Sequence, residues 1–195
     1  MYKGVFKLSN LYIALIHHPV LDKFGNGSTS SITSLDIHDI SRSARTYGVS
    51  KYFIVHPSEI QRQFVERVVN HFVVGEGKSF NPDRGETLLI VEVLKSLQVV
   101  VEKITDIESE KPYVIATTAK EEETQINFKF LRKKIMEESR PFLLLFGTSW
   151  GLTEEIVQNS DFVLRPLCRE SDPEYNHLSV RAASGIILDK VLGRN

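Results

Sequence analysis

Cysteine is almost absent from this sequence, which has only Cys168 among its 195 residues. A single cysteine cannot form an intramolecular disulfide or a cysteine-rich zinc site, which fits a reducing compartment and predicts a cytoplasmic location. Long apolar runs are missing as well. The run from Leu11 to Ile16 is far shorter than the roughly 20 residues of a membrane-spanning helix, and His17-His18-Pro19 ends it. We expect no membrane insertion and interpret this run as the first buried strand.

The sequence has no excess of charge of either sign. Its 24 Lys and Arg residues against 25 Asp and Glu residues give a formal net charge of -1, which argues against coating of nucleic acid by bulk electrostatics. A polyanionic partner would have to meet a local basic patch. At 195 residues and 42% apolar composition, the chain can build one sizeable core but is short for two domains. We therefore expect residues 1–195 to form a single catalytic domain.

Several motifs of common cofactor and metal sites are missing. Gly77-Lys78-Ser79 resembles the end of a phosphate-binding loop, but Phe72 occupies the position where that motif needs its first glycine. No Gly-x-Gly-x-x-Gly follows a predicted strand, which removes the main support for an NAD or FAD site. The six histidines show no His-x-x-x-His spacing, so we expect no bound metal. Cys168 has no evident neighbouring base, which predicts a packed, unreactive side chain.

What the sequence does contain is an alternation of apolar strands with amphipathic helices along its whole length. This pattern predicts an α/β fold with a mostly parallel sheet and helices on both faces. The predicted strands are 11–16, 51–56, 99–101, 113–116, 142–146 and a strand from residue 162. The predicted helices are 35–47, one that begins after a Ser58 and Gln61 capping box, 86–96, 127–140, one after Gly151, and 177–192, with a helical turn near 103–107. The segments 17–34, 75–85 and 120–124 are predicted loops.

The last third of the chain carries the clearest signal for a binding site. The apolar run Phe142–Phe146 ends at Gly147, and the next helix begins only after Gly151. Phe162–Leu164 likewise runs into a loop, ahead of a closing helix that Asn176 would cap. Since α/β proteins bind ligands in the loops at the carboxyl ends of such strands, these two loops are the predicted ligand site.

Three blocks of sequence together resemble the SPOUT superfamily of RNA methyltransferases. The first block, Asp36–Val49, is similar to the Asn-x-x-x-x-x-Arg-x-Ala-x-x-Phe-Gly motif of the ribose-methylating branch, with Asp36 in place of Asn and Tyr47 in place of Phe. The second block is Leu145–Leu152, and the third runs from Leu164 to Cys168 and on to Ala183. The order and spacing of the blocks carry the resemblance, which covers nearly the whole chain.

The resemblance implies a deep C-terminal trefoil knot, roughly residues 112–195, that binds S-adenosyl-L-methionine (AdoMet). Loops after three neighbouring strands would present backbone amides and carbonyls to the cofactor, and Gly147 and Gly151 would let the backbone approach it closely. Glycines that merely end a strand and start a helix would explain the same two positions. The implied cofactor-binding residues are Thr117, Thr118, Phe146, Gly147, Gly151, Leu152, Leu164, Pro166, Tyr175, Asn176, His177, Leu178, Ser179 and Ala182.

Arg42 is the residue that we predict to handle the methyl acceptor, because the family places an arginine at this point of the first block. A guanidinium is a poor base, which favours phosphate binding or lowering of the acceptor pKa over proton abstraction. Asp39 and His38 are the candidate bases, although Asp39 would equally well form a helix ion pair with Arg42. Asn176 completes the candidate catalytic set, or only caps the closing helix.

RNA contact is predicted for two groups of basic residues, which a solvated charged face would also explain. These residues are Arg42, Arg45, Lys129, Arg132 and Lys133. Members of the family dimerise through helices of the knot region, so the resemblance also implies a homodimer in which two subunits complete one site.

The sequence therefore predicts an AdoMet-dependent methyltransferase that modifies tRNA or rRNA, at a ribose 2′-hydroxyl or at a base nitrogen such as guanine N1. The sulfonium of AdoMet is an excellent leaving group, so alignment and proton removal are the main tasks, and no metal is needed. Two alternatives stay open: a non-catalytic RNA-binding or assembly protein that keeps the fold, and an α/β enzyme that acts on a small molecule.

Overall fold

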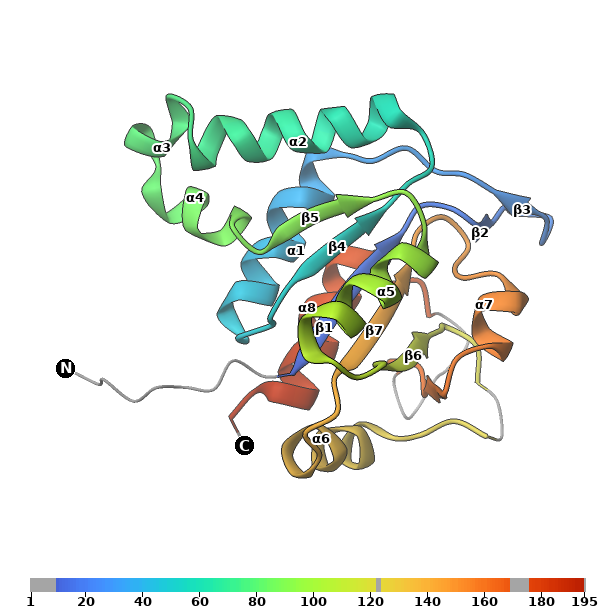
Figure 1. Cartoon of the computed structure of the whole chain (residues 1–195). Coiled ribbons are helices and arrows are strands. Elements are labelled where there is room, and N and C mark those ends of the chain that lie inside the picture. Colours follow the sequence, from blue (N-terminus) through green and yellow to red (C-terminus); the bar gives the residue numbers. More distant parts are fainter. Residues whose placement is uncertain (1–9, 122–123, 169–175, 195) are drawn as a thin grey trace.

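The centre of the computed structural model, which describes residues 10–121, 124–168 and 176–194, is a six-stranded sheet with the strand order β5-β4-β1-β7-β6-β8 (Figure 1). All of its neighbouring strands pair in parallel. The strands are β1 (Leu11–Ile16), β4 (Tyr52–Val55), β5 (Val91–Leu94), β6 (Tyr113–Thr117), β7 (Phe142–Gly147) and β8 (Phe162–Leu164). A short antiparallel hairpin of β2 (Val20–Leu21) and β3 (Gly27–Ser28) stands apart from the sheet.

Strands β1 and β7 form the middle of the sheet. They pair along their full length, from Leu11 opposite Phe142 to Ile16 opposite Gly147. Every residue of β1 is buried, as is every residue of β7 before Gly147. A strand that is covered on both faces reads as a continuous apolar run, which is why these two strands could be predicted without alternation in the sequence.

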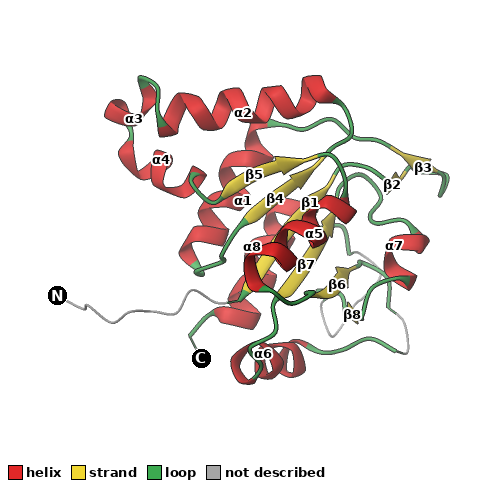
Figure 2. Cartoon of the chain, in the orientation of Figure 1, coloured by secondary structure: helices red, strands yellow, loops and turns green. Residues whose placement is uncertain are grey.

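Helices cover both faces of the sheet (Figure 2). Side chains from α1 (Ser34–Thr46), α2 (Glu59–Val73), α4 (Pro82–Leu88), α6 (Phe128–Glu137) and α8 (Val180–Leu192) share one buried cluster on one face. On the opposite face, α5 (Leu97–Glu108) and α7 (Glu154–Gln158) pack on a second cluster. The short α3 (Gly77–Phe80) lies beside α2 and α4. The predicted α/β fold with a parallel sheet and helices on both faces is confirmed.

The predictions for residues 75–101 were wrong, whereas the predicted helical turn near 103–107 lies within a longer helix, α5. The predicted loop 75–85 contains α3 and much of α4, and the predicted helix 86–96 is the end of α4 followed by strand β5. The predicted strand 99–101 lies inside α5, where the side chain of Ser96 caps the helix by accepting from Val99 N. Because Val100 and Ile104 are buried one turn apart, the tertiary packing of that face overrides the strand preference of three consecutive valines.

The first turns of two helices also differ from the prediction. Ser58 precedes α2 but makes no capping bond with its side chain, and the Gln61 side chain instead accepts from Ile32 N at 2.8 Å. The closing helix begins at Val180 rather than at residue 177, and Ser179 is its cap in place of Asn176. Ser179 Oγ accepts from Ala182 N at 3.2 Å, which satisfies one of the free amides of the first turn.

A partly buried ion pair joins the first helix to the last. Asp36 Oδ1 lies 2.9 Å from Arg181 Nη1, and Asp36 Oδ2 accepts from the Thr33 hydroxyl at 2.6 Å. Tyr52 Oη donates to the backbone oxygen of Asp36 at 3.2 Å. Asp36 is almost fully buried, so its charge depends on Arg181 and Thr33 for compensation.

No helix in the described ranges is long and apolar enough to cross a membrane. Nor does that part of the chain hold a group of three or more His, Cys, Asp or Glu residues that could bind a metal ion.

We expect Arg181→Ala to lower the free energy of unfolding by about 1–3 kcal/mol, because it leaves the buried carboxylate of Asp36 without its charged partner. Urea denaturation followed by circular dichroism measures this change. Lys133→Ala removes an exposed cation and should change the free energy of unfolding by less than about 0.5 kcal/mol. Equal stability of both variants would show that the Asp36–Arg181 pair does not hold α1 to α8.

Candidate functional site

The loops predicted to bind a ligand meet at one edge of the sheet. Strands β7, β6 and β8 are neighbours and run parallel, so the loops that follow Gly147, Thr117 and Leu164 all leave the same edge. Thr117 Oγ1 donates to the Leu145 oxygen at 2.7 Å and so ties the end of β6 to β7. Asn176 Nδ2 donates to the Ala119 oxygen at 3.0 Å. This bond joins the segment before α8 to the loop after β6.

The loop after β7 is shaped by its two glycines for different reasons. A Cβ atom on Gly147 would lie 2.5 Å from the backbone nitrogen of Leu152, so the loop folds back on its own first residue too closely for any side chain. Gly151 has φ +103 and would meet nothing within 4 Å. Packing within the loop therefore requires Gly147, whereas the left-handed backbone requires Gly151 and leaves open space beside it.

The β2–β3 hairpin is bonded to this loop. Leu21 N donates to the Gly151 oxygen at 2.9 Å, and Trp150 N donates to the Leu21 oxygen at 3.1 Å. Val20 forms a bridge with Leu152 next to these bonds. The predicted loop 17–34 thus supplies an ordered support for the Gly147–Leu152 loop, which the sequence pattern did not reveal.

A buried polar network lies where β1 and β7 end side by side. His17 Nδ1 is 3.0 Å from Ser30 Oγ, which in turn bonds to Thr148 Oγ1. Thr148 Oγ1 also donates to the Ile16 oxygen at 3.0 Å. Burial lowers the pKa of His17 to about 4, with the nearby Asp36 opposing this shift and His56 adding to it. His17 is therefore neutral near pH 7.

The candidate catalytic residues on α1 face different neighbours. Arg42 is exposed and forms no ion pair with the described residues. Asp39 is not paired with Arg42, because its Oδ2 lies 3.8 Å from Arg181 Nε. His38 packs against Phe72 of α2, and burial lowers its pKa. His38 therefore faces α2, whereas Asp39 faces α8.

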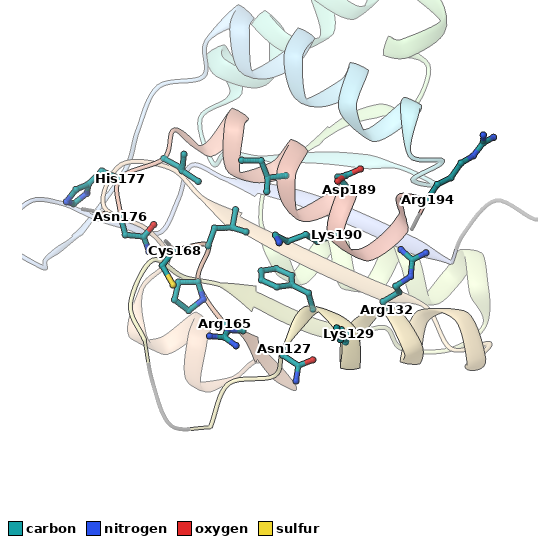
Figure 3. A pocket seen from close by; sticks show the side chains of 15 residues that line it. Asn127, Lys129, Arg132, Arg165, Cys168, Asn176, His177, Asp189, Lys190 and Arg194 are labelled. Carbon is teal, nitrogen blue, oxygen red and sulfur yellow. The ribbon is translucent and has the colours of Figure 1, made fainter. Parts of the chain in front are cut away.

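A cavity of about 970 Å³ lies between α6, α8 and the segment after β8 (Figure 3). Four of the predicted cofactor residues line it: Pro166, Asn176, His177 and Leu178. The other lining residues are Asn127, Phe128, Lys129, Arg132, Arg165, Leu167, Cys168, Ile186, Asp189, Lys190 and Arg194. Cys168 is exposed here, so the prediction of a packed thiol was wrong.

The remaining predicted cofactor residues lie outside this cavity. Phe146, Leu152 and Leu164 are buried beneath the loops. Thr118 Oγ1 accepts from Lys120 N at 3.0 Å within its own loop, and Ser179 and Ala182 form the first turn of α8. Tyr175 lies outside the described residues.

Apart from Arg42, the predicted RNA-binding residues separate into two groups. Arg45 pairs with Glu86 of α4, and Lys133 lies 3.9 Å from Glu137 on its own helix. Lys129 and Arg132 instead line the cavity. Sequence reasoning missed three further cations there, because Arg165, Lys190 and Arg194 come from segments that approach α6 only in the folded chain.

The parallel sheet delivers three such loops to one edge, and the neighbouring helix α1 carries the exposed Arg42. The sequence model of the family described as SAM-dependent RNA methyltransferase matches residues 10–193. The chain belongs to this family, which makes AdoMet its cofactor and RNA its substrate class.

Two similar proteins match nearly the whole of this chain. An uncharacterized protein of Aquifex aeolicus (strain VF5) is 37% identical over 186 residues, which are 95% of this chain and 90% of that protein. A protein named tRNA (guanine-N(1)-)-methyltransferase from Nitratidesulfovibrio vulgaris is 42% identical over 184 residues, 94% of this chain but 42% of that protein. The chain therefore spans less than half the length of this named relative.

The fold itself is shared with a solved methyltransferase structure. The SpoU methyltransferase AviRb from Streptomyces viridochromogenes, in complex with the cofactor AdoMet, has a TM-score of 0.54 and 15% sequence identity. The match covers 93% of this chain and 56% of that chain.

We expect acid to destabilise the protein through His17. Its pKa is about 4 in the folded chain against 6.5 for an unperturbed histidine, so the unfolded state binds more protons between these values and stability falls as the pH drops from 6.5 toward 4. This group alone should lower the free energy of unfolding by about 2 kcal/mol between pH 7 and pH 5. Chemical denaturation at both pH values measures the loss, which should shrink by that amount in His17→Gln.

The neighbouring histidine provides the control for this measurement. His18 is exposed and bonds to Thr29 instead of Ser30, so His18→Gln removes a histidine from the same segment and leaves the buried network of His17 intact. A His17→Gln variant whose stability falls with acid as steeply as that of the wild type would refute the role of His17.

Proposed function

We propose that this chain binds AdoMet at the loops after β6, β7 and β8 and transfers the methyl group to tRNA, with guanine N1 as the acceptor. The observation that carries the proposal is the meeting of these three loops at one sheet edge, with open space beside Gly151. The name of the relative from Nitratidesulfovibrio vulgaris supports tRNA and guanine N1 as the target. A cytoplasmic location belongs to the same proposal, since tRNA is found there.

The residues at the three loops fit a cofactor of this kind. The loops present backbone groups at the carboxyl ends of the strands, above a packed apolar floor that contains Leu152 and Leu164. Bound AdoMet would supply a methyl group already activated by its sulfonium. The chain's own task is then to hold donor and acceptor in line and to keep water out.

Arg42 is the residue that we propose for the acceptor. Its guanidinium is always charged, exposed and free of an ion pair in the described part of the chain, so it can bind an RNA phosphate or stabilise the negative charge that develops on the acceptor base. Asp39, the nearby carboxylate beside Arg181, is the proposed proton acceptor. Asn176 donates to Ala119, which supports a role in shaping the cofactor loops rather than in the chemistry.

The position of Asp36 favours a base acceptor over a ribose. In the ribose-methylating branch, an Asn stands at this position of the first block. Here both carboxylate oxygens of Asp36 are engaged, one by Arg181 and one by Thr33, and the residue is almost fully buried. Asp36 is thus fully used in joining α1 to α8 and has no free atom for the RNA.

We also propose a homodimer. Leu35 and Arg42 lie seven residues apart on the same side of α1, and Leu35 leaves an apolar side chain 55% exposed. A second copy on this side of α1 would cover Leu35 and bring its own residues to the site near Arg42. The C-terminal knot, with α8 drawn through the loops around β6 and β7, belongs to the same proposal, and the Asn176–Ala119 bond supports it.

The cofactor site predicts a specific loss on substitution of Gly147. Gly147→Val places side-chain atoms against the backbone of Gly151 and Leu152, so the loop must open and AdoMet binding should weaken at least about tenfold from a micromolar dissociation constant. Isothermal titration calorimetry measures the affinity. Gly27→Ala, at a glycine with open space around it, should bind like the wild type. Failure of the wild-type chain to bind AdoMet would overturn the proposed site.

The proposed role of Arg42 predicts a catalytic loss without a binding loss. Arg42→Ala should lower methyl incorporation from labelled AdoMet into unmodified tRNA by about 100-fold, with unchanged AdoMet affinity. Arg45→Ala, one turn along α1 and already paired with Glu86, is the matched control and should stay near wild-type activity. Equal losses of activity in both variants would show that Arg42 contributes only positive charge and has no specific role at the acceptor.

Mass spectrometry of the product nucleosides identifies the acceptor, since 1-methylguanosine would support guanine N1 and a 2′-O-methylated nucleoside would overturn it. Tight tRNA binding without any methyl incorporation would instead favour the non-catalytic RNA-binding alternative.

A further inference from the structure

The cavity between α6 and α8 concentrates positive charge. Five of its lining side chains are cationic and one is anionic, although the whole chain has 24 basic and 25 acidic residues. The cations are Lys129, Arg132, Arg165, Lys190 and Arg194, and the single carboxylate is that of Asp189. We call this feature the α6–α8 groove. Such a local excess on a nearly neutral chain marks a surface that attracts anions.

These cations have little compensation from the protein itself. Four of them, Lys129, Arg132, Lys190 and Arg194, form no ion pair within the described ranges, and Arg165 lies 3.9 Å from Glu121. Asp189 is itself engaged by Tyr47 Oη, which donates to it at 3.0 Å. A cluster of unpaired cations repels itself, so the groove is electrostatically incomplete without an anion.

Arg132 gives a second, independent sign of a missing partner. Its Nη1 is buried and has no hydrogen-bond acceptor among the described residues. Burying a charged donor without an acceptor costs free energy, which an oxygen from a ligand would recover. Arg132 lies in the middle of α6 and projects toward the end of α8 that carries Arg194 (Figure 3).

The length and floor of the groove favour an extended polyanion over a single small ion. Helix α8 has 13 residues and is therefore about 20 Å long, and lining residues come from before its start, at Leu178, to beyond its end, at Arg194. Phe128, Leu167 and Ile186 add apolar surface between the cations. A row of separate cations over such a length matches successive phosphates of a nucleic acid backbone.

We propose that the α6–α8 groove binds the phosphodiester backbone of the RNA substrate. This inference rests on the proposed function, and it adds Arg165, Lys190 and Arg194 to Lys129 and Arg132 as RNA contacts while it excludes Lys133. The groove is separate from the cofactor loops after β6 and β7, none of whose residues line it. The loop after β8 forms one wall of the groove from Arg165 to Cys168, so bound RNA would lie against the third cofactor loop.

The test compares groove variants with a matched surface variant. The probe is a fluorescein-labelled, unmodified tRNA transcript, and fluorescence anisotropy gives its dissociation constant between 50 and 200 mM KCl. The Arg132→Ala/Lys190→Ala double variant should bind at least about tenfold more weakly and lose about 1 to 2 units from the slope of log K against log salt concentration. Lys133→Ala, exposed on the same helix and outside the groove, should bind tRNA like the wild type.

A second pair of variants guards against misfolding. Lys129 and Arg194 are exposed and lie outside the three cofactor loops, so Lys129→Ala/Arg194→Ala should leave the core intact and weaken tRNA binding in the same way. AdoMet affinity, measured by calorimetry, should be unchanged in both double variants. If AdoMet binding fell together with tRNA binding, the groove would be part of the cofactor site and the inference would be overturned.

The single cysteine reports directly on the groove. Cys168 is exposed and lines it, so tRNA should slow the reaction of Cys168 with a thiol reagent in the wild type but not in the double variants. Wild-type protein that binds AdoMet and tRNA without protection of Cys168, or double variants that bind tRNA normally, would overturn this inference while the proposed function stands. Failure of the wild type to bind AdoMet would instead count against the proposed function.

Discussion

The parallel pairing of β1 with β7 is the constraint on which the rest of the structure depends. It places the ends of two strands that are 131 residues apart in sequence side by side, with Ile16 opposite Gly147. The chain leaves β1 toward β4 and leaves β7 toward β8, so the two connections diverge at this point. Such a divergence opens a crevice at the carboxyl edge of a sheet. The neutral His17, the hairpin and the Gly147–Leu152 loop all occupy this edge because the pairing brings them there.

The local sequence pattern was enough to predict the elements that are buried evenly on both faces or along one side. Strands β1 and β7 are buried on both faces, and α1 and α6 each present one apolar side, so their sequences alone predicted them. Pattern failed at residues 75–101, where β-branched residues form a strand in β5 and part of a helix in α5. There the choice is made by contacts with the rest of the chain, which a short window of sequence does not contain.

The candidate site likewise contains features that the sequence could predict and features that it could not. Gly147 and Gly151 could be predicted because a strand that stops at a glycine leaves a local signature. The Asp36–Arg181 pair joins residues 145 positions apart, and the groove joins α6 to Lys190 and Arg194 from the far end of the chain. Neither has a local signature. From the sequence of α6 alone, Lys133 and Arg132 were equally good candidates for RNA contact. Only the packing of α8 against α6 shows that Arg132 lies in the groove and Lys133 does not.

The position of β1 in the middle of the sheet also bears on how the protein is made. Until residue 147 has been synthesised, β1 can pair with β4 on one side only, and its other edge offers a fully apolar strand with unpaired amides and carbonyls. An open edge of this kind is where nascent chains join one another incorrectly. At a synthesis rate of about 5–20 residues per second, the wait from β4 to the end of β7 lasts several seconds. During that interval the ribosome and its chaperones, rather than the protein's own fold, must protect the strand.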